Sequence, residues 1–194
     1  EMVYYDSLTG LANRRLLSKE LNQAIKNIKP DSLLGVIFID LDSFKTVNDS
    51  VGHEGGDKVL KIASNKIASK LGEHDFIARF GGDEYIVVLP DYESEGEILR
   101  KAEDIKSSLE TAVVFDKHEF FLSASLGVAI YPKDGFTGEE LINNADLAMY
   151  KSKESGKDQL TSFNENMREE ADLQAILANT INKGFTQEEF FILY

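Results

Sequence analysis

The strongest hairpin signal in this chain of 194 residues is a single short turn. Two runs rich in branched and aromatic residues, 76–80 and 85–89, flank Gly81-Gly82-Asp83-Glu84. Adjacent glycines supply the positive φ angles that a tight turn requires, so the segment predicts a β-hairpin. Asp83 and Glu84 place two carboxylates at its tip, on a backbone that glycine leaves uncovered. A nucleotide can approach such a turn closely and use its N–H groups, although Gly-Gly-Asp is also an ordinary turn composition.

Alternating helices and strands are predicted around this hairpin, which indicates an α/β fold. Residues 33–41 form a continuous apolar run, typical of a strand covered on both faces. A second hairpin is predicted with arms at 112–116 and 120–131. Apolar spacing predicts the other elements: helices over 14–28, 58–71, 95–110 and 137–153, and a short strand over 158–163.

The character of the chain changes at Asn164. Residues 165–182 predict an exposed acidic amphipathic helix, and residues 189–194 an apolar strand. We therefore expect one domain over residues 1–163, followed over residues 164–194 by a linker helix and the truncated beginning of another domain. A folded domain seldom ends on an apolar strand without a partner, so a longer parent protein is expected.

Composition and charge limit the class of protein. Hydrophobic residues make up 42% and charged residues 28%, as in a folded globular domain. There is no cysteine, and apolar runs fall short of the roughly 20 residues that a membrane span needs. We expect a cytoplasmic domain, whether or not the parent protein is anchored in a membrane. A formal net charge of −13 disfavours binding to nucleic acid or anionic membranes, so any bound phosphate must meet local cations.

Acidic side chains end the predicted strand over residues 33–41. Asp40 and Asp42 nominally face the same side, and Asp40 would lie near Asp83 if the two strands are neighbours. Such carboxylates repel unless a cation lies between them, and oxygen ligands beside a triphosphate are what Mg²⁺ prefers. Strand termination or capping of the next turn is an equally good interpretation of Asp42.

Four further residues are candidates for nucleotide binding. Asn48 and Asp57 together can pair with a guanine edge, although Asp57 is also a plausible N-cap of the helix over 58–71. Lys153 and Lys157 lie four apart on one predicted helix face and could contact phosphate oxygens. Lysines on a helix are more often simply solvated.

Five segments in the same order and spacing resemble the GGDEF diguanylate cyclase family. They are residues 6–15, 40–45, 81–85, 125–129 and 145–156. The resemblance implies a palm-like α/β (α+β) fold with a central, mostly antiparallel sheet flanked by helices, akin to class III nucleotidyl cyclases. The segment over 164–194 resembles the beginning of an EAL phosphodiesterase domain, without its hydrolytic residues.

The resemblance also implies roles for matching positions. Asp40, Asp83 and the Leu41 carbonyl would hold the metal, two Mg²⁺ ions per site with Mn²⁺ as the alternative. Asp83 or Glu84 would help deprotonate the attacking 3′-hydroxyl, with Lys45 also in the catalytic set. The residues implied in substrate binding are Phe44, Asn48, His53, Asp57, Gly81, Gly82, Lys153 and Lys157.

The implied activity is condensation of two GTP molecules into cyclic di-GMP with release of pyrophosphate. One site would hold one GTP, so a homodimer is expected to be the active form, with an EAL domain attached in the parent chain. The alternative is a GTP-binding regulatory module that controls the attached phosphodiesterase. A cyclase making a mononucleotide fits these motifs less well.

Three positions depart from the family pattern. Tyr85 stands where the family has Phe, which is mild if its hydroxyl finds a partner. Lys157 replaces the more usual Arg and loses the bidentate fork. The product-inhibition motif Arg-x-x-Asp is Gly72-Glu73-His74-Asp75 here, so weak or absent product feedback is expected.

Overall fold

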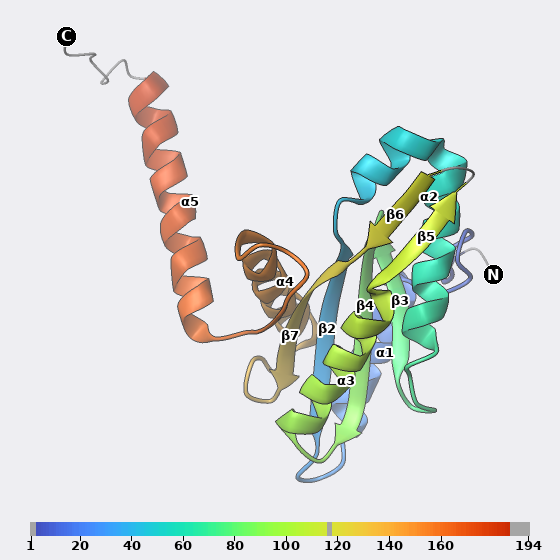
Figure 1. Ribbon diagram of the computed structural model, residues 1–194. Helices are drawn as coiled ribbons and strands as arrows, with labels where there is room; N and C mark the ends of the chain where they lie inside the picture. Colours follow the sequence, from blue (N-terminus) through green and yellow to red (C-terminus); the bar gives the residue numbers. More distant parts are fainter. Residues whose placement is uncertain (1–2, 116–117, 187–194) are drawn as a thin grey trace. The chain divides into compact units, whose positions relative to one another are not determined.

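Two compact units make up the chain, Glu1–Phe163 and Asn164–Tyr194. The computed structural model describes residues 3–115 and 118–186 (Figure 1). The second unit contains one helix, α5 (Glu165–Thr186), where the sequence predicts a helix over 165–182. The predicted strand over 189–194 lies outside the described residues. Within the described ranges, no helix is both long and apolar enough to cross a membrane.

A six-stranded sheet forms the centre of the first unit, in the order β1-β3-β4-β2-β7-β8. The three inner pairs are antiparallel, and the two edge pairs, β1 with β3 and β7 with β8, are parallel. The strands are β1 (Ala12–Asn13), β2 (Leu33–Leu41), β3 (Phe76–Gly81), β4 (Glu84–Tyr92), β7 (Ala124–Tyr131) and β8 (Leu160–Ser162). The sheet is therefore mostly antiparallel, as predicted.

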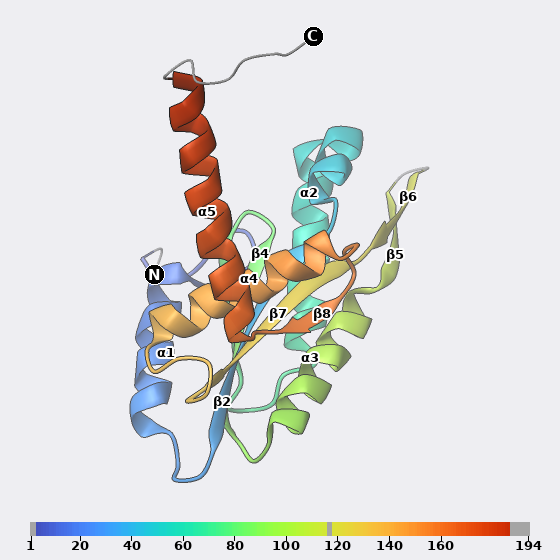
Figure 2. The ribbon, with the colours of Figure 1, turned by 90° about the vertical axis from the view of Figure 1, so that its left-hand side faces the viewer.

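Helices cover both faces of this sheet (Figure 2). α1 (Arg14–Asn27) and α4 (Gly138–Glu154) contact one face, and α3 (Glu95–Leu109) lies on the other and contacts α2 (Phe44–Ala68). Thr137 begins α4 with a capping box, in which its hydroxyl accepts from the Glu140 N–H and the Glu140 carboxylate accepts from the Thr137 N–H.

Strand β2 is buried on both faces, as its apolar run predicts. Ile37, Ile39 and Leu41 join a core cluster with buried residues of α2 and α3. Because side chains alternate along a strand, the intervening positions face α1 and α4. Asp40 belongs to this second set, so the backbone alone directs its carboxylate towards the α4 side.

Two predicted elements are corrected by the structure. Helix α2 begins at Phe44, and its helical geometry is interrupted at Gly52, with φ 73° and ψ 176°. Asp57 lies inside the second half of α2, so its predicted role as an N-cap is wrong. Glycine adopts a positive φ without strain, so the chain changes direction at Gly52 and the helix resumes after it.

The second predicted hairpin has a divided arm. β5 (Thr111–Phe115) pairs with β6 (His118–Leu122) in a separate two-stranded sheet, whereas β7 joins the main sheet. The predicted strand over 120–131 is therefore two strands, interrupted at Ser123. Residue 116, the end of the other predicted arm, lies outside the described residues.

Candidate functional site

Sheet register brings acidic residues of two strands into one row. Asp40 of β2 lies directly opposite Glu84 of β4 and Ser125 of β7. Directly paired residues point to the same face, so these side chains share the α4 side of the sheet. Asp83 lies in the turn just before β4, where its carbonyl accepts a 3.3 Å hydrogen bond from the Leu41 N–H. The predicted juxtaposition of the Asp40 strand with the hairpin tip is thus present.

Helix α4 supplies a cation to this row. Lys153 Nζ lies 2.7 Å from Asp40 Oδ2, and Asp40 is 6% exposed. Lys153 was predicted as a phosphate ligand rather than as the partner of a carboxylate. Its ammonium group lies next to the acidic side chains and offsets part of their negative charge in the ligand-free protein.

The carboxyl groups of Asp40, Glu84 and Asp146 each have a pKa above the ordinary value. Burial raises the pKa of Asp40, and nearby Asp83 raises it further, while Lys153 opposes both effects. Burial also raises the pKa of Glu84, to which the charges of Asp40, Asp146 and Asp83 add. Asp146 on α4 is exposed by surface area, yet surrounding protein removes enough of its hydration to raise its pKa too. The row is an electrostatically crowded site that favours an additional cation.

These residues fit a divalent metal by the chemistry of their donors. Only oxygen ligands are offered, and their mutual repulsion disfavours full ionisation without a cation. Among the described residues, no three His, Cys, Asp or Glu side chains form a ready-made metal cage. Two carboxylates and a backbone carbonyl would therefore need oxygens from a ligand or water to complete a shell, as Mg²⁺ usually does.

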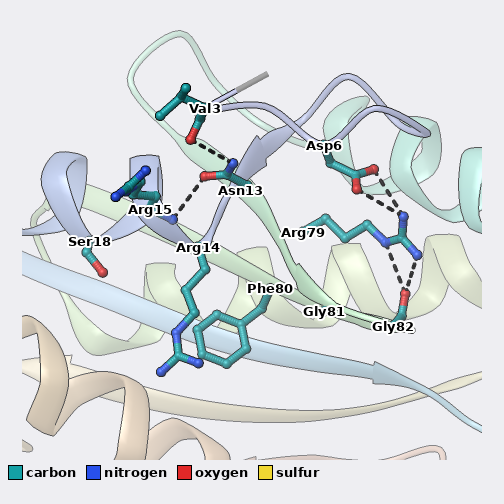
Figure 3. Close-up of a pocket in the computed structure, with 10 residues that line it drawn as sticks. All are labelled: Val3, Asp6, Asn13, Arg14, Arg15, Ser18, Arg79, Phe80, Gly81 and Gly82. Atoms are coloured by element: carbon teal, nitrogen blue, oxygen red, sulfur yellow. Dashed lines mark hydrogen bonds and ion pairs between the residues drawn. The ribbon is translucent and has the colours of Figure 1, made fainter. Parts of the chain in front are cut away.

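Arg79 on β3 holds the hairpin tip and is itself bound by Asp6 of the first segment of the domain (Figure 3). Arg79 donates through Nε and Nη2 to the Gly82 carbonyl at 3.0 and 2.7 Å. Its Nη1 donates to both carboxylate oxygens of Asp6, at 3.1 and 3.2 Å. Gly82 has a φ of 46°, a left-handed conformation that glycine adopts without strain. The turn that carries Asp83 is thereby fixed from outside.

The predicted guanine ligands come from the two halves of α2. Asn48 precedes the break at Gly52 and Asp57 follows it. A Cβ atom on Gly56 would collide with the Asn48 side chain, so the present position of that amide depends on residue 56 being glycine. The structure therefore brings the Asn48 amide next to Gly56, the neighbour of Asp57. His53 and Lys45 are exposed on the same helix.

Lys157 does not lie on the helix that carries Lys153. Helix α4 ends at Glu154, and Lys157 follows it with a φ of 65°. The prediction of two lysines on one helix face is wrong for this residue, because Gly156 ends the helical path before it. Lys157 Nζ instead points towards Ser43, 3.5 Å from its Oγ, just before the first turn of α2.

Two positions that depart from the family pattern, Tyr85 and Gly72, form hydrogen bonds in the structure. The buried Tyr85 hydroxyl donates to the Leu60 carbonyl at 3.0 Å and lies 3.4 Å from Ser64 Oγ, which confirms that the added oxygen is satisfied. Asp75 accepts from the Gly72 N–H at 2.7 Å and from the Tyr92 hydroxyl, and Lys101 lies 3.7 Å away.

A cavity of about 770 Å³ lies beside the glycine turn but away from the acidic row. It is lined by Asn13, Arg14, Arg15 and Ser18 of the β1–α1 segment together with Phe80, and its lining includes none of Asp40, Asp83 and Glu84. Arg14 stacks over the Phe80 ring at 4.6 Å, and Arg15 points away from it (Figure 3). The cavity is therefore separate from the acidic row.

Sequence reasoning missed three contributors to this site. Asp146 stands seven residues before Lys153, two helical turns along α4, so helical periodicity could have placed both on one face. The Arg79–Asp6 pair joins residues 73 positions apart, and only the fold reveals it. Gly56 had no local signal beyond being one of two adjacent glycines.

The comparisons with known proteins agree with this geometry. Residues 3–159 match the model of the diguanylate cyclase GGDEF domain. The bifunctional diguanylate cyclase/cyclic di-GMP phosphodiesterase MucR of Pseudomonas aeruginosa is 35% identical over 195 residues, covering 100% of this chain and 28% of its own length. The cyclic di-GMP phosphodiesterase NbdA of the same organism is 34% identical and is covered over 25% of its length. This chain thus spans about a quarter of the length of these relatives.

Solved structures show the same fold. The GGDEF domain of TpbB from Pseudomonas aeruginosa matches with a TM-score of 0.83 at 34% identity, covering 87% of this chain and 99% of that one. A sensory box/GGDEF family protein from Caulobacter crescentus matches with a TM-score of 0.74 at 41% identity, covering 79% and 99%. The predicted palm-like α/β fold is confirmed. With a family model that matches most of its length, the chain belongs to the GGDEF diguanylate cyclase domain family.

Proposed function

We propose that this domain is a diguanylate cyclase, which condenses two GTP molecules into cyclic di-GMP and releases pyrophosphate. The observation that carries the proposal is the row of Asp40, Asp83 and Glu84, whose carboxyl groups crowd one face of the sheet beside Lys153. An acidic row with a nearby ammonium group suits a triphosphate that arrives with cations of its own.

The oxygen donors of this row would coordinate the metal. Asp40, Asp83 and the Leu41 carbonyl would hold Mg²⁺, two ions per site or Mn²⁺ in their place. Bound there, the metal would lower the pKa of a ligated hydroxyl and offset charge on the phosphates.

The chain's own residues bind and orient the substrate. Asn48 and Asp57 hydrogen-bond the guanine edge, and the exposed Gly81 and Gly82 backbone admits the ribose and phosphates, lined by Phe44, Lys45 and His53. Lys153 and Lys157 bind the β- and γ-phosphates. For this, Lys153 exchanges its contact with Asp40 for phosphate oxygens, and that exchange frees Asp40 as a ligand.

Glu84 is suited to accept the proton of the attacking 3′-hydroxyl. Burial and three neighbouring acids raise its pKa, which brings its basicity closer to that of a group working near neutral pH. Asp83, in the adjoining turn, is the other candidate for this role.

Joining two GTP molecules requires two domains that face each other, so a homodimer is proposed as the active form. The parent protein is proposed to be cytoplasmic in this part, with the segment over 164–194 as a linker helix and the beginning of an EAL domain. Names of relatives that pair both activities, such as MucR, support that assignment.

A regulatory function is the second candidate. NbdA, which aligns with the whole of this chain, is named as a phosphodiesterase. In that case the domain binds GTP, makes little product and tunes the attached enzyme.

An assay over a protein concentration series separates the two functions. Protein incubated with GTP and MgCl₂ is expected to release pyrophosphate and cyclic di-GMP, with specific activity rising with concentration because the product needs two domains. Asp83→Ala is expected to lower the rate by about 100- to 1,000-fold, because it removes a proposed ligand of the metal that would offset phosphate charge in the transition state.

The matched control is Asp104→Ala, which removes an exposed carboxylate from α3. It should leave the rate unchanged. Tight GTP binding without pyrophosphate release at every protein concentration would establish the regulatory module instead.

A further inference from the structure

A buried carboxylate next to the proposed metal ligands has a structural task of its own. Asp42 follows β2 and is 7% exposed. Its Oδ1 accepts a 2.7 Å hydrogen bond from Ser125 Oγ, and its Oδ2 accepts from Ser123 Oγ at 3.0 Å. Both serines flank the beginning of β7, so the carboxylate is bound firmly to the edge where the second sheet branches off.

The same carboxylate also holds the loop that follows α4. Asp42 Oδ2 accepts a 3.0 Å hydrogen bond from the backbone N–H of Asp158. Asp158 and Lys157 both have left-handed backbones, with φ of 49° and 65°. Non-glycine residues adopt this conformation only at an energetic cost, so contacts from outside the loop must hold it.

Other contacts fix the two ends of this loop. The Lys157 N–H donates to the Ser152 carbonyl at 3.1 Å, and the Gln159 carbonyl accepts from the Leu126 N–H of β7 at 2.8 Å. The buried ammonium group of Lys106 on α3 lies 2.9 Å from the Asp158 carboxylate. Figure 2 shows the path from α4 through this loop into β8, beside β7.

The contacts of Asp42 affect the position of Lys157. Asp42 is followed directly by Ser43, whose left-handed backbone begins α2 and whose Oγ is 3.5 Å from Lys157 Nζ. The Asp42 carboxylate thus links two segments proposed to bind phosphate, the first turn of α2 and the loop of Lys157, in addition to the contacts that fix the ends of that loop.

We propose that Asp42 is a positioning residue for the triphosphate, because its carboxylate ties the loop at residues 155–158 to the end of β2 and so places the Lys157 ammonium group. The inference rests on the proposed function. It assigns Asp42 no contact with substrate or metal and separates it from Asp40, which lies two residues earlier.

Binding measurements test the proposal without turnover. Asp42→Asn keeps the size of the side chain but places an amide where two donors, the Asp158 N–H and a serine hydroxyl, converge. Titrations use 3′-deoxy-GTP, which lacks the attacking hydroxyl, and GMP, which lacks the β- and γ-phosphates. Asp42→Asn should weaken 3′-deoxy-GTP binding about tenfold, on the order of one charge-assisted contact, and leave GMP binding unchanged.

Two further variants sharpen this test. In a Lys157→Met background, Asp42→Asn should have little additional effect, because the group it positions is gone. Asp104→Asn makes the same chemical change on the exposed face of α3 and should alter neither titration. If Asp42→Asn does not fold, Ser123→Ala removes one donor from the same oxygen and should give a smaller loss with the same preference for the triphosphate.

Equal losses for both nucleotides, additivity with Lys157→Met, or no loss at all would overturn the positioning role. Amide hydrogen exchange of the ligand-free protein provides an independent readout. Exchange in the segment over 155–159 should be faster in Asp42→Asn than in wild type, and unchanged exchange would also overturn the role. Failure of the wild-type protein to bind 3′-deoxy-GTP would overturn the proposed function, while the exchange measurement would still decide whether Asp42 holds the loop.

Discussion

The charge on a single side chain, Asp146, is expected to oppose folding. Its carboxyl group lies on α4 near Lys153, and its charge adds to the repulsion at Glu84. Partial loss of hydration raises the pKa of Asp146 above its ordinary value. A carboxyl group with a raised pKa in the folded state favours folding at low pH, and this contribution is lost as the pH rises through the raised pKa.

Asp146→Asn is therefore expected to stabilise the metal-free protein at neutral pH. The midpoint of thermal unfolding should exceed that of wild type at pH 7.5. The difference should shrink towards zero below about pH 3.9, the ordinary pKa of an unfolded aspartate, where both states are protonated. Circular dichroism melts at both pH values measure this.

Asp104→Asn is the matched control, since this exposed carboxylate lies on α3 and does not belong to the acidic row. It should not produce the same pH-dependent difference. A lower melting midpoint for Asp146→Asn at pH 7.5 would show that attraction to Lys153 outweighs the loss of hydration.

At the level of elements, one glycine decides how closely α4 approaches the sheet. Gly127 of β7 lies opposite Phe38 of β2 and so faces α4. A Cβ atom there would collide with the backbone of Ala145, Ala148 and Met149. Because these are backbone atoms rather than flexible side-chain ends, the helix itself would have to move.

Gly127→Ala is expected to lower the free energy of unfolding by about 3 kcal/mol, the upper end of what overpacking a core costs. Chemical denaturation measures this loss. Since α4 carries Lys153, binding of 3′-deoxy-GTP should weaken as well.

Gly96→Ala provides the matched control for this substitution. A Cβ atom on Gly96 would meet only Arg100 Nη1 at 3.5 Å and Ser94 Oγ at 4.0 Å, and alanine is the better helix former within α3. Stability should stay the same or rise slightly. Equal stability of Gly127→Ala and wild type would show that α4 can shift without cost.

For the whole molecule, we expect weak product feedback, because the arginine of the product-inhibition motif is absent. Asp75 is present, but Gly72 stands where the family motif has an arginine. In a protein of net charge −13, an anionic dinucleotide gains little from the general field and needs a local guanidinium fork. Cyclic di-GMP is therefore expected to inhibit the wild-type domain weakly.

Gly72→Arg should lower the concentration of cyclic di-GMP needed for half-maximal inhibition by at least about tenfold. This is the effect expected of one bidentate contact. The position tolerates a side chain, because a Cβ atom there would meet only Asp75, at 3.4 Å. Gly72→Ala controls for loss of the glycine. The same weak inhibition in all three proteins would show that the arginine alone does not make the site.

Local chemistry explains which features were predictable. The glycine turn at Gly81-Gly82, the buried run of β2 and the helix α4 are each specified by residues next to one another, through turn geometry, burial and capping. Asp40 and Asp83 could be paired in advance because neighbouring strands must bring their ends together. The break of α2 at Gly52 was missed, since a lone glycine inside a helical segment has several outcomes.

Contacts between distant residues could only be found in the folded chain. The ion pair of Lys153 with Asp40, the clamp of Arg79 on Asp6 and the hydrogen bond of Asp158 to Asp42, residues 116 positions apart, depend on how α4 and the loops pack on the sheet. Short-range patterns were sufficient to identify the family, most of the elements and the acids at the strand ends. The partner of each charged group and the position of Lys157 required the folded chain, because ion pairs form between residues that packing brings together in space.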